Sequence, residues 1–145
     1  MRTSIDIPGV GTFVHEPGGV SYRHYVLELP RPNARPTLAI VYLQGDELPA
    51  HYAMHVRQVF ARATQQHAAM LVAARAKVEH LMTQYGLALP PEFHTFAESL
   101  ELTHVKPFPD GGAELIFGVC SWFPNFDLNA SLDADLAIDT VWFDG

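Results

Sequence analysis

The segment HYAMH, residues 51–55, places two histidines four positions apart at the start of a long apolar-periodic stretch. On a helix this spacing puts both imidazoles on one face, one turn apart, as paired metal ligands require. A helical zinc protease motif would carry glutamate directly after the first histidine, and Tyr52 stands there instead. Arg62 follows His55 by seven residues on the same helical face, where its cation would oppose a metal. We therefore predict that His51 and His55 are polar residues at the border of a structural helix and bind no metal.

Cys120 is the single cysteine and ends the apolar run LIFGVC. A lone cysteine in such a run is usually a small core residue. A nucleophilic thiolate would need a neighbouring base and an electropositive setting, and the surrounding acids oppose one. We predict no catalytic residue and no cofactor. One cysteine forms no internal disulfide, which favours a reducing compartment.

The net charge of −7 is unevenly distributed along the chain. Residues 1–106 hold all nine Lys and Arg residues together with nine acids, so their charges sum to zero. Residues 107–145 hold the other seven acids and no Lys or Arg. Nucleic-acid binding normally needs a basic stripe, which this sequence lacks. The charge favours a basic partner protein, and the alternative is an acidic surface that only keeps the chain in solution.

Composition predicts one compact domain over residues 1–145, because 48% of the residues are hydrophobic and only 17% are charged. No apolar run approaches the roughly 18 residues that span a bilayer. The N-terminal segment MRTSIDIPGVGTF also lacks the apolar region of a secretory signal. We therefore expect a cytoplasmic protein that does not associate with membranes.

Two regions of strand-like alternation flank one helical segment. Strands are expected at 11–16, 20–29, 37–43, 99–108, 113–120, 126–132 and 136–143. A long helix is expected over 47–85, with Asp46 as a possible N-cap, Gly86 just past its end, and a break or bend near 63–66. Its apolar stripe is Tyr52, Val56, Val59, Phe60, Ala63, Met70, Leu71, Ala74, Val78, Leu81, Met82 and Tyr85. This order predicts an α+β domain, an antiparallel sheet of about six or seven strands with one long, broken or bent helix packed on one face.

Aromatic side chains crowd the acidic C-terminal region. The segment 126–132 alternates apolar and polar residues. On the last strand, Leu136, Ile138 and Trp142 are expected on one face, and Val141 and Phe143 on the other with Asp135, Ala137 and Asp139. Exposed aromatics beside acids fit an interface with a basic protein. The predicted partner-binding residues are Asp127, Asp133, Asp135, Asp139, Trp142 and Phe143. Alternatively, this face of the sheet is covered or forms a homodimer, so monomer and homodimer both stay open.

The chain resembles small bacterial α+β domains of unknown function, some of which look like immunity proteins of polymorphic toxin systems. The resemblance rests on the order of elements and on the segments LELTHV, AELIFG and AIDTVWFDG after the helix. It implies a domain that binds a cognate toxin and blocks it, and it assigns no catalytic residue. Two alternatives stay open: a small enzyme or ligand-binding domain that uses His51, His55 or Cys120 in a pocket between helix and sheet, and a self-assembling structural protein.

Overall fold

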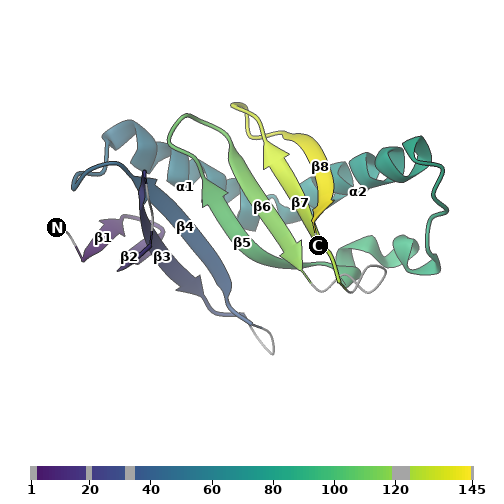
Figure 1. Ribbon diagram of the computed structural model, residues 1–145, viewed down its shortest axis with the longest axis horizontal. Coiled ribbons are helices and arrows are strands. Elements are labelled where there is room, and N and C mark those ends of the chain that lie inside the picture. The colour runs from purple at the N-terminus through teal and green to yellow at the C-terminus, as the bar shows by residue number, and fades with distance from the viewer. Residues whose placement is uncertain (1–2, 19–20, 32–34, 119–124, 145) are drawn as a thin grey trace.

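The chain folds into one large sheet with its helices on one face (Figure 1). The computed structural model describes residues 3–18, 21–31, 35–118 and 125–144. The strands are β1 (Ser4–Ile7), β2 (Gly11–Glu16), β3 (Arg23–Leu29), β4 (Thr37–Leu43), β5 (Glu101–Pro107), β6 (Ala113–Gly118), β7 (Asp127–Leu132) and β8 (Ile138–Asp144). The fold is α+β with a mostly antiparallel sheet, as the order of elements predicts.

The strands lie side by side in the order of the sequence. Neighbours pair antiparallel throughout, except that β4 and β5 pair parallel. Their ladder joins only Leu38 to His104 and Ala39 to Val105. The chain between these two strands holds the helices, because a parallel connection must cross over the sheet rather than turn back in a hairpin.

The sheet has eight strands within the described residues, rather than six or seven. The additional strand is β1, whose four residues SIDI alternate exposed and buried positions. It forms a hairpin with β2, in which Ile5 pairs with Phe13. Gly11, at φ 148°, begins β2 directly after the turn. A four-residue alternation next to Pro8 and Gly9 is too short to stand out as a strand in the sequence.

The helical segment is two helices, α1 (Ala50–Gln65) and α2 (His67–Gln84), which meet at Gln66. This confirms the break expected near 63–66. The expected N-cap is wrong, because Pro49 occupies that position and the Asp46 carboxylate instead pairs with the guanidinium of Arg23. The short helix η1 (Pro91–Ser99) follows and leads into β5.

Gly86 ends α2 as expected. Its φ of 67° is left-handed, and its N–H donates to the carbonyl of Thr83. The N–H of Leu87 donates to the carbonyl of Met82 at 2.8 Å. These two bonds form a Schellman motif, which satisfies carbonyls that the helix end leaves free.

The core lies between the helices and one face of the sheet. Alternate residues of the central strands are fully buried there, including Tyr25, Val41, Leu115 and Phe117. Most of the predicted helical stripe is buried against them, and Leu81 is partly buried. Tyr85 is 69% exposed, so its assignment to the stripe is wrong. It stands at the C-cap of α2, where the backbone leaves the helical path.

The hairpin of β7 and β8 forms as predicted, but the parity assigned to the last strand is partly wrong. An irregularity between Ser131 and Leu132 pairs them with Thr140 and Ile138, so Asp139 is an extra residue. Such a bulge reverses the alternation of side chains. Ile138 therefore lies on the helix-covered face with Val141, while Trp142 lies on the opposite face. Among the described residues, no helix has the length and hydropathy to cross a membrane.

Candidate functional site

The sheet face opposite the helices, here called the open face, carries no helix or strand from the described part of the chain (Figure 1). Ladder partners point to the same side of a sheet, so the pairing identifies its residues. A row of half-buried or exposed side chains crosses it from β2 to β8. The row contains Val14, Val26, Ile40, Leu38, His104, Ile116 and Trp142, with the buried Asn129 between the last two.

Carboxylates surround this row. By the same pairing, the acids on the open face are Asp6, Glu16, Glu28, Glu101, Glu114, Asp127 and Asp144. Lys106 is the only Lys or Arg that the described ladders place there, and its partner is Glu114. The face therefore combines an apolar centre with net negative charge, although its acids come from seven different strands.

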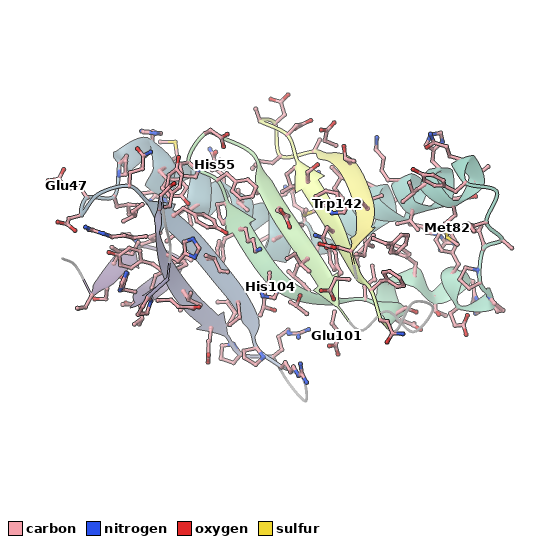
Figure 2. The ribbon with its side chains drawn as sticks, in the orientation of Figure 1. Glu47, His55, Met82, Glu101, His104 and Trp142 are labelled. Carbon is pink, nitrogen blue, oxygen red and sulfur yellow. The ribbon has the colours of Figure 1, made fainter. Side chains whose placement is uncertain are left out.

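His104, Asn129 and Trp142 lie near the middle of the C-terminal half of the open face, and Figure 2 shows the first and last of these over the sheet. Burial, with a smaller contribution from Lys106, lowers the pKa of His104 from its usual value, and nearby carboxylates oppose this shift. Asn129 is only 6% exposed and donates to a carboxylate oxygen of Glu114 at 3.3 Å. The side-chain amide oxygen of Asn129 has no hydrogen-bond partner among the described residues. A buried acceptor in that state is costly for folding.

A recess of about 420 Å³ lies at the other end of the open face, and we call it the aromatic recess. It is lined by Ser21, Tyr22, His24, Tyr42, Phe108, Pro109 and Asp110. Three rings contact Tyr42, with centroids 4.9 Å away for His24, 5.9 Å for Phe108 and 6.5 Å for Tyr22. Burial and, secondly, the negative charge of Glu114 raise the pKa of the Tyr42 phenol, which keeps it neutral.

Tyr52 of α1 holds the sheet together beside the aromatic recess. Its hydroxyl accepts the backbone N–H of Tyr42 at 3.0 Å and donates to the carbonyl of Pro107 at 2.7 Å. The described β4–β5 ladder does not extend to these residues, so this phenol bridges the two strands. Burial raises the pKa of Tyr52, consistent with a phenol that stays protonated as a donor.

The predicted partner-binding residues do not form one surface. Asp127 and Trp142 lie on the open face. Phe143 pairs with Leu128 on the helix-covered face and packs against the core, so it is not part of the open face.

The three other predicted acids lie at or near the turn between β7 and β8. Asp133 has a local role, because its carboxylate accepts the backbone N–H groups of Asp135 and Ala137 at 2.9 and 3.0 Å. Asp135 and Asp139 are exposed, in the turn and at the bulge. A count of charge along the sequence therefore groups acids that lie on different parts of the surface.

His51 and His55 play different roles although they share a helical face. An imidazole nitrogen of His55 lies 2.5 Å from the carbonyl oxygen of Gly112, and Figure 2 labels this residue on α1. His51 is exposed and lines a small cavity of about 140 Å³ with Glu47 and Tyr52. The described residues hold no group of three His, Cys, Asp or Glu side chains arranged for a metal. Cys120, like Trp122 and Phe123, lies outside the described residues.

The aromatic recess was missed in the sequence because its residues come from three distant segments. The alternation of β3 and β4 was the available signal, since His24 and Tyr42 have the parity opposite to the buried Tyr25 and Val41. In comparisons with known proteins, no family model, no curated protein and no solved structure matches the chain.

Proposed function

We propose that the protein is a non-enzymatic binding domain that engages a basic partner protein through the open face. Following the resemblance stated above, we propose further that the partner is a toxin and that the domain acts as an immunity protein by occluding it. Occlusion needs a stable scaffold and a complementary surface, and it needs no chemistry.

The observation that carries this proposal is the combination of apolar and acidic side chains on an uncovered sheet face. Half-buried side chains such as Ile40, Ile116 and Trp142 offer area that a partner can bury. The surrounding carboxylates attract a basic surface and fix its orientation. Interfaces commonly pair such an apolar centre with a polar rim.

A self-assembling protein that uses this face against a second copy is less well supported. Face-to-face association would bring the acids of one copy against those of the other. Like charges brought together at an interface oppose association by several kcal/mol. The same charges favour a basic partner, which is why we prefer a heteromeric complex.

The proposal is tested with the full chain as bait in affinity capture. A triple variant, Glu28→Gln, Glu114→Gln and Asp127→Asn, removes charge from the open face. A matched variant, Glu79→Gln, Glu92→Gln and Glu98→Gln, removes the same charge from the helical segments. We expect a basic protein that the wild type and the helix variant retain and the open-face variant loses.

The kinetics and the biological effect complete the test. Association of the captured partner should slow in the open-face variant and lose much of its salt dependence, because the Debye length falls from about 10 Å at 0.1 M salt to about 3 Å at 1 M. Co-expression should protect cells from the partner if it is a toxin. Equal association rates for both charge variants would show that the open face is not the interface.

A further inference from the structure

The aromatic recess presents several π systems to one space. Tyr42 is its centre, with the rings of Tyr22 and His24 nearly perpendicular to it at 84° and the ring of Phe108 tilted by 34°. Tyr22 is 36% exposed, so the recess opens to solvent. The faces of aromatic rings carry partial negative charge and attract cations, most strongly where water is partly excluded.

Full negative charges reinforce this attraction. Asp110 lines the recess, and Glu114 is close enough to raise the pKa of Tyr42. Glu16 is the ladder partner of His24. Lys106 opposes a bound cation, but it lies across the ladder from Glu114. The surroundings of the recess therefore favour a positive ligand.

The walls of the recess are held in place before any ligand arrives. The hydroxyl of Tyr52 bonds to the backbone of Tyr42 and to that of Pro107, the residue before Phe108. One buried side chain from α1 thus holds the backbone that carries two of the lining rings. A preorganised site loses less conformational entropy on binding.

We propose that the aromatic recess binds the guanidinium group of an arginine side chain from the partner, an inference that rests on the proposed function. Arginine fits better than lysine for two reasons. Its planar group is weakly hydrated and stacks on aromatic rings, and its fork of N–H donors matches the carboxylate of Asp110. The recess then supplies the specific anchor within an interface whose other acids act mainly at long range.

The direct test titrates the full chain with N-acetyl-arginine N-methylamide and follows amide shifts by NMR. The citrulline analogue, which has nearly the same shape and no charge, is the control ligand. We expect shifts centred on Tyr42, Phe108 and Asp110, and affinity for the arginine compound roughly fivefold or more above that for citrulline. Equal affinity for the two compounds, or shifts centred elsewhere, would overturn the proposal.

Variants locate the binding within the recess. Asp110→Asn and Tyr22→Leu should each weaken arginine binding severalfold, whereas Lys106→Gln should strengthen it. Asp135→Asn and Tyr85→Leu change an exposed acid and an exposed tyrosine elsewhere, and they should have no effect. Thermal melts of every variant establish that it is folded. The assignment is contradicted if Asp110→Asn and Tyr22→Leu bind the arginine compound as tightly as the wild type does. It is also contradicted if Asp135→Asn and Tyr85→Leu lose binding.

The inference and the proposed function can fail separately. If a basic partner is captured through the open-face acids but Tyr22→Leu and Asp110→Asn leave its affinity unchanged, the arginine anchor is wrong and the binding function stands. If the arginine compound binds in the recess but no protein partner depends on the open face, the occupant is a free organic cation and the proposed protein interface falls.

Discussion

The two faces of the sheet are built from the same strands, yet they differ in what covers them and in what their residues do. On the helix-covered face, side chains such as Phe117 and Tyr25 are buried almost completely. On the open face, their sequence neighbours Ile116 and His24 are half-buried and lie among carboxylates. We infer that the covered face supplies most of the stability, which leaves the open face free to be selected for binding. Neighbouring residues of one strand offer a direct way to compare the two faces.

The largest difference is expected on β6. Phe117→Ala empties a fully buried site and should lower the free energy of unfolding by about 3–5 kcal/mol. Ile116→Ala removes a half-buried side chain from the open face and should cost about 1 kcal/mol. Denaturant unfolding of both variants gives the comparison. Similar losses at the two positions would mean that the open face contributes as much to the core as the covered one.

Tyr52 connects the covered layer to the open face, and its removal should have the next largest effect. Tyr52→Phe keeps the ring but loses the hydrogen bonds to Tyr42 and Pro107, which leaves one part-buried and one buried backbone group without this partner. We expect a loss of about 1–3 kcal/mol in denaturant unfolding. The matched change Tyr85→Phe, at an exposed residue, should stay within about 0.5 kcal/mol. A negligible loss for Tyr52→Phe would show that the bridge contributes nothing.

Asn129 should contribute little to stability although its side chain is buried on the open face. Its amide carbonyl is buried without a described partner, so the residue stabilises the free protein little. Asn129→Leu should therefore change the free energy of unfolding by less than about 1 kcal/mol in either direction. If the variant instead unfolds at much lower denaturant, Asn129 is a structural residue, and the division of roles between the faces fails at its centre.

Replacing His104 should have the smallest effect, a change in how the free energy of unfolding depends on pH. Its pKa is lowered in the fold because burial disfavours the imidazolium. The unfolded chain therefore takes up the proton first, and stability should fall as the pH drops below the usual imidazole value of 6.5. Unfolding free energies of wild type and His104→Gln across this range provide the measurement. The variant should show the flatter profile, and parallel profiles would contradict the assignment.

Regular periodicity made much of the fold predictable. Alternation marked seven of the strands, helical spacing marked α1 and α2, and Gly86 marked the end of α2. The failures come from local irregularity. The bulge at Asp139 shifts the parity of β8. In addition, β1 is too short to be recognised before its pairing with β2 is known.

The candidate site was much harder to predict, because its residues come from distant parts of the sequence and meet only in the folded sheet. A charge count along the chain drew attention to residues 107–145, but Asp133 serves the local turn and Phe143 faces the core. The open face instead gathers acids such as Asp6, Glu28 and Glu114 from strands far apart in the sequence. Only the register of the ladders shows that these residues share a surface.

The parallel pairing between β4 and β5 also has a consequence for how the chain folds. It divides the sheet into two four-stranded meanders, β1–β4 and β5–β8, in which successive strands pair antiparallel. Contacts between near neighbours in sequence form quickly, whereas closing a long loop costs entropy before its contacts repay it. We therefore expect the two meanders to form early and the β4–β5 junction to close late. The bridge of Tyr52, which sits at that junction, would then belong to the last step of folding, when the two halves become one continuous sheet.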